Sequence, residues 1–457
     1  MAKFDFSKRD SFGSKIGIIA AAAGSAIGLG NIWRFPYVAG ENGGGAFLLI
    51  YLLFVFLIGM PVMLSEFVIG RGSQRNPMGA FRLLAPGSKW FLAGIIGIIA
   101  AFLILAFYST VAGWTLEYLY QAIGQGFKGK DTQQLSLMFD DFHQSGLRPV
   151  IWQTVFMFLT AFIVFNGIKN GIEKYTKILM PALFLIIIGL GIRAVTLPGA
   201  GQGLAFLFQP DFSKINANTM LQALGQAFFS LSLGMGTMIT YGSYVSKKDR
   251  LPNITFSVTL ADFAISILAG IAIFPAVFAF NIAPESGAGL VFITLPMIFE
   301  QIPGGYFFSI IFFVLLSIAA LTSTISLLEV AVACFSEELG ISRKKATIIS
   351  ALSINILGIF CTLSQGPLPK LSIMGKNLFD MFDFVSANIM LPMGGFFIVV
   401  FLGWKMDKKV VFNELTNNNS LKFSLQTIFM FIIKYIAPVA IGIVFLNGLG
   451  ILDMIGL

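Results

Sequence analysis

The sequence predicts an all-α protein that crosses a membrane about eleven times, and two observations carry this prediction: its composition and the length of its apolar segments. Of 457 residues, 56% are hydrophobic and only 11% are charged. Segments of about 20 apolar residues, enough for a helix to span a bilayer, follow one another along the whole chain. Their centres lie near Gly28, Phe56, Leu105, Phe158, Phe184, Leu231, Leu268, Leu321, Ile354, Met393 and Val439. We therefore expect a single transmembrane domain over residues 1–457.

The short loops between these segments indicate the orientation of the chain. Lysine and arginine are concentrated in the loops on the N-terminal side, and basic loops of this kind stay in the cytoplasm. We therefore expect a plasma (inner) membrane protein with a cytoplasmic N-terminus, and an odd number of spans puts the C-terminus outside. The net charge of +8 is spread over many loops. This distribution favours a lipid bilayer as the partner and argues against nucleic acid.

The first apolar segment is interrupted. Residues 24–36 read GSAIGLGNIWRFP, with glycines, an asparagine, an arginine and a proline inside an otherwise apolar run. In lipid, each backbone N–H or C=O released from a helix costs several kcal/mol unless a ligand, an ion or a neighbouring helix satisfies it. The carbonyls that end one half-helix suit a cation, and the N–H groups that begin the next suit a carboxylate. The interruption therefore predicts a binding site.

A second interruption lies in the sixth apolar segment. Residues 225–237 read GQAFFSLSLGMGT, in which Gly234 and Gly236 flank a methionine. If residues 11–195 and 216–405 are two structural repeats, the interrupted segments are the first member of each, as at the midplane site of secondary transporters. Residues 424–450 would then form an additional eleventh helix.

Further motifs follow in order: ENGGGAF at residues 41–47, SEFVIGR around Glu66, Tyr108, LTST at residues 321–324, and Asp383. With these motifs, residues 9–403 resemble the neurotransmitter:sodium symporter family, in an eleven-span bacterial variety. The resemblance implies a LeuT-type fold, with an inverted repeat of five plus five helices and discontinuous helices 1 and 6. It also implies symport of an amino acid with sodium ions, by alternating access.

The same resemblance implies a substrate site. The N–H groups of Leu29 and Gly30, with the Tyr108 hydroxyl, would hold a carboxylate. Monoamine-carrying relatives have aspartate where this chain has Gly28, so glycine favours an amino acid. The implied pocket offers no partner for a charged substrate side chain, so we expect a bulky hydrophobic amino acid: tryptophan, tyrosine, phenylalanine, leucine or methionine. The full set is Ala26, Gly28, Leu29, Gly30, Ile104, Tyr108, Phe229, Ser230, Ser232, Met235, Ser323 and Leu327.

Two sodium sites are implied, both built from hard oxygen donors. Site one would use Ala26, Asn31, Ser230, Asp262 and the substrate carboxylate, and site two would use Gly24, Ile27, Ala319, Thr322 and Ser323. Most relatives have asparagine where this chain has Asp262. Chloride-dependent relatives balance sodium with an anion held at the positions of Tyr51, Gln226, Ser230 and Ser266. Because a carboxylate at Asp262 supplies that charge, we expect no chloride requirement.

Other charged and helix-breaking residues have implied roles in gating. Arg34 and Asp383 would form an outer gate, and the inner gate would use Arg9, Glu337 and Tyr244, with Glu329 nearby. Glu66 is expected to support the broken first segment by accepting its hydrogen bonds. Gly171 and Pro181 both weaken the helix between them, and their spacing matches a family motif proposed to unwind and admit water to sodium site two.

An enzyme is not expected. The single histidine, His143, lies in a loop, and the sequence contains no metal-ligand spacing or nucleophile motif. Two alternatives remain open: a proton-coupled or exchanging carrier in which Asp262 or Glu66 titrates, and an amino-acid sensor. A sensor would be expected to have an appended cytoplasmic domain, for which we find no segment. No obligate protein partner is inferred.

Overall fold

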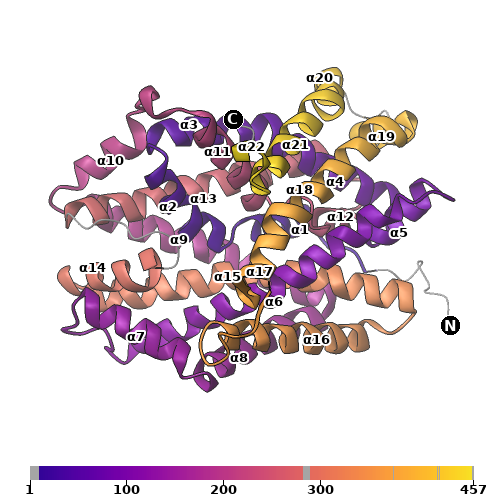
Figure 1. The fold of residues 1–457 in the computed structure, drawn as a ribbon. Coiled ribbons are helices and arrows are strands. Elements are labelled where there is room, and N and C mark those ends of the chain that lie inside the picture. The colour runs from indigo at the N-terminus through magenta and orange to yellow at the C-terminus, as the bar shows by residue number, and fades with distance from the viewer. Residues whose placement is uncertain (1–9, 281–288, 374, 419, 421–422, 455–457) are drawn as a thin grey trace.

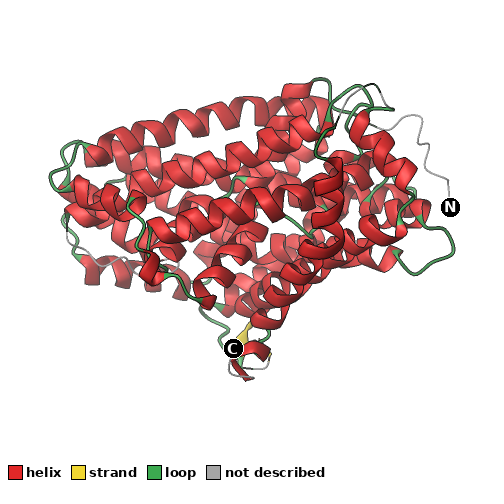
Figure 2. Cartoon of the chain, turned by 90° about the horizontal axis from the view of Figure 1, so that it is seen from above, coloured by secondary structure: helices red, strands yellow, loops and turns green. Residues whose placement is uncertain are grey.

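The computed structural model describes residues 10–280, 289–373, 375–418, 420 and 423–454, which are almost entirely helical (Figure 2). The α-helices are α1 Lys15–Ala26, α2 Phe35–Glu41, α3 Gly45–Phe54, α4 Met60–Ser73, α5 Pro77–Leu84, α6 Phe91–Ile123, α7 Thr132–Gln144, α8 Leu147–Phe165, α9 Lys174–Val195, α10 Ala200–Phe208, α11 Ala217–Ser230, α12 Thr237–Gly242, α13 Leu251–Ala279, α14 Leu295–Gln301, α15 Gly305–Leu339, α16 Arg343–Ser364, α17 Leu378–Phe384, α18 Leu391–Val400, α19 Lys408–Thr416, α20 Gln426–Phe431, α21 Ala437–Gly448 and α22 Ile451–Met454. One 3-10 turn covers Phe212–Lys214, and a small antiparallel hairpin pairs β1, Ser372–Ile373, with β2, Lys376–Asn377.

Wide, π-type turns continue several of these helices. They cover Gly30–Arg34, Val55–Gly59, Ile168–Glu173, Leu290–Thr294, Val385–Met390, Phe401–Lys405 and Ile432–Ile436. Most of them end shortly before a proline, namely Pro36, Pro61, Pro296, Pro392 or Pro438. A proline ring clashes with the carbonyl four residues earlier, and a wider turn moves that carbonyl aside without ending the helix.

The number of membrane spans agrees with the predicted fold class. Among the described residues, nine helices are long and apolar enough to cross a membrane, and the pair Lys15–Ala26 and Gly30–Glu41, bent by 52°, makes a tenth. The sixth predicted span is α11 followed by α12, helices of 14 and 6 residues separated by a break. The all-α membrane fold with discontinuous first and sixth helices is thus confirmed, whereas the exact bounds of the two repeats stay predictions.

The other helices pack around the broken first helix, and four of them form one group. Figure 1 shows α6, α8, α15 and α16 together in the lower half, where α6 lies against α8, α15 and α16. Helix α1 packs against α15 of this group and also against α13 and α9. The first broken helix therefore lies between this group and the pair α9 and α13. Its residues Ile18, Ala21 and Ala22 are fully buried. This position puts the break near Gly28 inside the protein.

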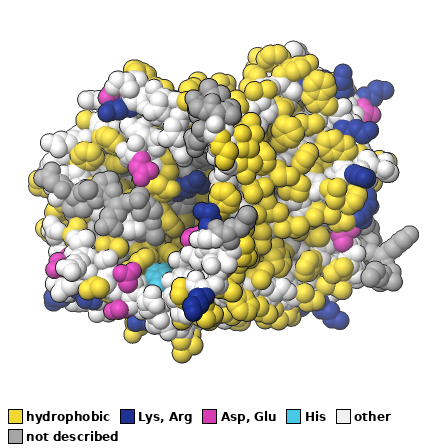
Figure 3. All heavy atoms as spheres, viewed as in Figure 1, with side chains coloured by type: hydrophobic (Ala, Val, Ile, Leu, Met, Phe, Trp, Pro, Cys, Tyr) yellow, Lys and Arg dark blue, Asp and Glu magenta, His cyan; other side chains and the backbone are white. Residues whose placement is uncertain are grey.

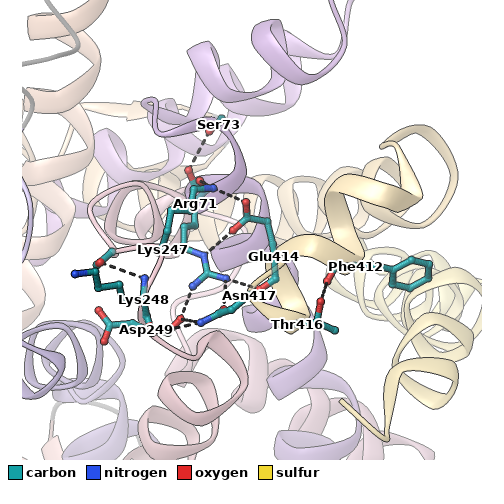
Figure 4. Close-up of polar contacts among 11 residues, drawn as sticks. Arg71, Ser73, Lys247, Lys248, Asp249, Phe412, Glu414, Thr416 and Asn417 are labelled. Carbon is teal, nitrogen blue, oxygen red and sulfur yellow. Dashed lines mark hydrogen bonds and ion pairs between the residues drawn. The ribbon is translucent and has the colours of Figure 1, made fainter. Parts of the chain in front are cut away.

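One end of the molecule holds Asp10, the end of α15 and the start of α16, and we call it the N-terminal side. A cluster of charges there joins α19 to α4 and to the loop after α12 (Figure 4). Arg71 is 1% exposed, and its Nε lies 2.6 Å from Glu414 Oε2. Lys247 donates to the Arg71 carbonyl at 2.9 Å and also pairs with Glu414. Asn417 Oδ1 accepts from Arg71 at 3.1 Å, so the buried guanidinium is well satisfied.

Candidate functional site

The break in the first helix leaves backbone groups that other residues satisfy. Helix α1 ends at Ala26, and Ile27 is extended, with φ −80° and ψ 104°. The N–H of Gly28 donates to Asn31 Oδ1 at 3.1 Å, and the N–H of Leu29 donates to the Tyr108 hydroxyl at 3.0 Å. Two predicted site residues therefore hold the free N–H groups of the break.

Gly28 has no room for a side chain. A Cβ at this position would lie 2.5 Å from Ser323 Oγ and 3.1 Å from the Tyr108 hydroxyl. A Cβ at Gly30 would lie 3.0 Å from the ring of Phe229. The glycines thus let the unwound backbone approach α6, α11 and α15 closely.

The break in the sixth helix has a different construction. Between α11 and α12, Ser232, Gly234 and Gly236 have φ of +54°, +81° and +76°, in the left-handed region that favours glycine. The N–H of Gly234 donates to Glu66 Oε1 at 2.8 Å. Glu66 was expected to accept hydrogen bonds from the broken first segment, and this expectation was wrong: the bond comes from the sixth helix. The reason is that α4 packs directly against α12. A support role for Glu66 stays a prediction.

The two breaks are also joined to each other. The Ser232 hydroxyl donates to the carbonyl of Ser25 at 2.8 Å, and Gln226 Nε2 donates to the carbonyl of Gly30 at 3.1 Å. Ser232 was predicted to line the substrate site, and Gln226 corresponds to an anion-binding position of chloride-dependent relatives, but neither was predicted to connect the two breaks.

The residues predicted for sodium site one meet around Asp262, which is fully buried. Asn31 Nδ2 donates to Asp262 Oδ1 at 2.7 Å, and the Ser230 hydroxyl donates to Oδ2 at 3.0 Å. The Tyr51 hydroxyl lies 3.3 Å from Oδ2 and 2.8 Å from Ser230 Oγ. Ser266 lies 3.0 Å from Asn31 Nδ2. Ala26, whose carbonyl was also predicted as a ligand, is the last residue of α1.

The residues predicted for sodium site two also come together. Ser323 Oγ lies 3.4 Å from the Gly24 carbonyl oxygen and 3.5 Å from that of Ile27. Thr322 Oγ1 donates to the Ala319 carbonyl at 3.1 Å, and a Cβ on Gly24 would lie 3.0 Å from Thr322 Cβ. This group of neutral carbonyl and hydroxyl oxygens is the donor type that a hard monovalent cation prefers.

The side chains predicted around the substrate come from α6, from α15, and from α11 with the break that follows it. Ile104 and Tyr108 lie one turn apart on α6, and Ser323 and Leu327 lie one turn apart on α15. Met235 lies in the sixth break and is 5% exposed. Ile104 and Leu327 are equally well buried, so the predicted lining includes apolar side chains that are shielded from the surroundings of the protein.

The two residues predicted for the outer gate, Arg34 and Asp383, both lie in the described part of the chain and do not form an ion pair in this structure. The Arg34 guanidinium instead lies over the ring of Phe229, 4.5 Å from its centroid, where it gains a cation–π interaction. Arg34 and Phe229 line a cavity of about 90 Å³ together with residues of α18 and α21.

On the N-terminal side, the predicted gate residues belong to two networks. The Tyr244 hydroxyl donates to Glu329 Oε1 at 2.7 Å, and Arg343 donates to the same oxygen at 2.8 Å. Glu337 accepts from the backbone N–H of Asn76 at 2.8 Å. Arg9 lies outside the described residues.

Arg343 was not among the residues predicted from the sequence. The signal was available, because Glu329 lies in the middle of an apolar segment and a buried carboxylate needs a cation. Gly171 lies in a wide turn before α9, where a Cβ would lie 2.1 Å from the Ile163 carbonyl oxygen, and Pro181 lies within α9. The segment between them is helical, so its unwinding stays a prediction.

A family model described as the sodium:neurotransmitter symporter family matches residues 9–134 and 127–454. The chain belongs to this family. The "Uncharacterized sodium-dependent transporter YhdH" of Bacillus subtilis is 43% identical over 440 residues, covering 96% of this chain and 98% of the relative. An "Uncharacterized sodium-dependent transporter" of Haemophilus influenzae is 36% identical over 453 residues, covering 97% of this chain and 98% of the relative.

A solved structure agrees with this assignment. The crystal structure of MhsT in complex with L-phenylalanine is 48% identical and covers 96% of this chain and 100% of that chain, with a TM-score of 0.88. MhsT has the LeuT fold. As a member of the symporter family, the protein is a sodium-dependent, multi-pass membrane transporter and not an enzyme.

Proposed function

We propose that this symporter carries a hydrophobic L-amino acid into the cell together with sodium ions, and that it does not need chloride. One observation carries the proposal: the non-helical N–H groups of Gly28 and Leu29, the Tyr108 hydroxyl and two clusters of oxygen donors lie together at the break in the first helix. The N–H groups suit the substrate carboxylate, and the oxygens suit sodium.

The lining of the site supports a hydrophobic substrate. Ile104, Met235 and Leu327 are buried and uncharged, so a charged substrate side chain would lose its hydration without gaining a partner. Met235 has a flexible side chain that can adapt to large apolar groups. The complex of MhsT with L-phenylalanine supports the inclusion of aromatic amino acids among the candidates.

The surroundings of Asp262 support chloride independence. The Tyr51 and Ser230 hydroxyls, which would face a chloride ion in dependent relatives, lie within 3.3 Å and 3.0 Å of Asp262 Oδ2. The carboxylate thus brings a fixed negative charge to the place where an anion would otherwise balance sodium. Sodium at site one would also meet the Asn31 side chain, which already contacts Asp262.

We also propose that the N-terminal side faces the cytoplasm. Figure 3 shows Lys and Arg side chains along the right-hand end of the molecule, where α5 and α19 lie in Figure 1. This distribution is typical of cytoplasmic loops. The Tyr244–Glu329–Arg343 network, with Glu337 and Arg9, would then be the inner gate, and Arg34 with Asp383 the outer one. Unwinding between Gly171 and Pro181 would release sodium from site two.

Coupling follows from shared ligands. The substrate carboxylate would complete the shell of sodium at site one, so each ligand lowers the cost of binding the other, and the effect is reciprocal. Alternating access would then move the bundle of first, second, sixth and seventh spans against the remaining helices once both ligands are in place.

The test is uptake of labelled phenylalanine, tryptophan and leucine into proteoliposomes under an inward sodium gradient, with chloride replaced by gluconate. Uptake should require sodium and should continue without chloride. It should fail in Asn31→Ala and Thr322→Ala, while Lys408→Gln, on the exposed face of α19, serves as the control. Uptake driven by a proton gradient without sodium would contradict the proposal and favour the proton-coupled alternative.

The role of Asp262 has its own test. Asp262→Asn removes the fixed negative charge but retains the size of the side chain. We expect this variant to gain a dependence on chloride, measured as uptake at a series of chloride concentrations. If the variant is active and still ignores chloride, the charge at Asp262 does not replace an anion.

A further inference from the structure

Two helices on the outer surface, α8 and α16, enclose a groove that plays no part in the proposed transport site. It is lined by Thr154, Met157, Phe158, Ala161, Phe162, Phe165, Thr347, Ile348, Ala351, Leu352 and Asn355, and its volume is about 370 Å³. This volume lies in the range of small-molecule sites, about 300–1,000 Å³. Phe158 is 69% exposed and Leu352 is 57% exposed, so the groove is open to the surrounding lipid.

The end of this groove on the N-terminal side is positively charged. Lys344 Nζ lies 5.2 Å from the ring centroid of Phe165, which lines the groove. Lys345 follows, and both lysines are exposed. Among the described acidic residues, none forms an ion pair with Lys344 or Lys345. The lysines lie in the first turn of α16, whose N-cap residue Ser342 makes no side-chain cap bond, so free N–H groups add to the positive field there.

We propose that this groove binds an anionic phospholipid from the leaflet on the N-terminal side. One acyl chain would lie in the apolar groove between α8 and α16. The phosphate would be held by Lys344 and Lys345 at the start of α16. The site therefore joins the two chemical features of such a lipid, an apolar chain and a negative headgroup, in the order in which the leaflet presents them.

Charge argues against a second copy of this chain as the occupant. In a two-fold dimer the same patch faces itself, so the lysines of one copy would approach those of the other. Neither α8 nor α16 contains an aspartate or glutamate that could offset this repulsion. A lipid phosphate meets the lysines without that cost.

The site also adjoins the network on the N-terminal side. Arg343, which precedes Lys344, donates to the carbonyl of Val164 at 3.2 Å and pairs with Glu329. Val164 precedes Phe165 in the wall of the groove. A lipid bound here would therefore hold the ends of α8 and α16 together where Glu329 is anchored, and by linkage it should raise the thermal stability of the protein.

Native mass spectrometry of the full-length protein, extracted in detergent and mixed with phosphatidylglycerol or phosphatidylcholine, tests this proposal. The unaltered protein should retain phosphatidylglycerol several-fold more than phosphatidylcholine. Lys344→Gln with Lys345→Gln should abolish this preference. Lys408→Gln with Lys409→Gln removes the same charge from α19 on the same side and should leave the preference unchanged.

A groove-filling variant separates binding in the groove from general attraction to lysines. Ala161→Phe fills the groove and retains both lysines, so it should also lose phosphatidylglycerol. The melting temperature in nanodiscs gives a second readout. Phosphatidylglycerol should raise it for the unaltered protein, but not for Ala161→Phe or for the double variant Lys344→Gln with Lys345→Gln. Equal retention by all variants, equal retention of both lipids, or dimers that Ala161→Phe disrupts would overturn the proposal.

Discussion

The break in the first helix and the break in the sixth are satisfied by different kinds of partner. At the first, the N–H groups of Gly28 and Leu29 donate to Asn31 and Tyr108, which both belong to the predicted ligand sets. At the sixth, the N–H of Gly234 donates to Glu66, which belongs to none. Asn31 and Tyr108 can therefore exchange their bonds to the backbone for bonds to a ligand. Glu66 is not a predicted ligand, so its bond to the sixth helix can persist throughout transport.

The two breaks also differ in their backbone torsions. The first leaves the helix at Ile27 with ordinary extended torsions. The sixth has left-handed torsions at Ser232, Gly234 and Gly236, which disfavour a continuous helix in any state. The backbone of the first break could therefore return to a helix, whereas the torsions of the sixth break exclude one. Substitutions should affect ligand binding at the first and stability at the sixth.

The largest effect is expected at Gly28. In Gly28→Ala the new methyl group lies 2.5 Å from Ser323 Oγ, and overpacking of this kind costs about 1–3 kcal/mol. If the upper end of this cost falls on the ligand-bound state, phenylalanine affinity should fall about 100-fold, measured by equilibrium binding to purified protein. Gly225→Ala is the matched control, because a Cβ there meets nothing within 4 Å. Equal affinities in the two variants would mean that the first break tolerates a side chain.

Tyr108→Phe should have the next largest effect. It removes the acceptor of the Leu29 N–H and, by our proposal, a donor to the substrate carboxylate. Hydrogen bonds to charged groups contribute about 1.5–3 kcal/mol, so substrate affinity should fall by about tenfold or more. Sodium binding without substrate should change little. A loss of both in equal measure would indicate that Tyr108 supports the fold and not the ligand.

Glu66→Ala should act on stability. It leaves the Gly234 N–H without its partner, which costs about 1–3 kcal/mol in a buried setting. The melting temperature of the ligand-free protein should fall. Glu66→Gln retains an acceptor oxygen and should recover most of the loss. If Glu66→Ala instead lowers sodium affinity at an unchanged melting temperature, the sixth break is part of the ion site.

The smallest effect is expected at Ser232, where two contributions oppose each other. Ser232→Gly relieves the left-handed torsion but removes the bond to the Ser25 carbonyl, and each contributes about 1 kcal/mol. The melting temperature should therefore hardly change. Ser232→Ala loses the bond and retains the unfavourable torsion, so it should be less stable than Ser232→Gly. The reverse order would show that the left-handed torsion costs little, because both variants lack the bond. A clear loss of stability in Ser232→Gly relative to the unaltered protein would show that the bond between the two breaks outweighs the torsion.

The sequence by itself determined the features that depend on near neighbours along the chain. Apolar segments of membrane length, glycines that interrupt two of them, and motif order were enough to predict the fold class and both breaks. The wide turn before Pro61 follows from the same local rule, because the clash of a proline ring involves only the preceding turn.

The tertiary structure alone decided which distant groups meet. Glu66 bonds to the sixth helix and not to the first, Glu329 pairs with Arg343, and Arg71 pairs with Glu414, 343 positions away. A charged residue inside an apolar segment must be paired, and the sequence is enough to predict that such a pair exists. The identity of the partner depends on which helices pack together, because a helix brings only residues three or four positions apart into contact on its own surface.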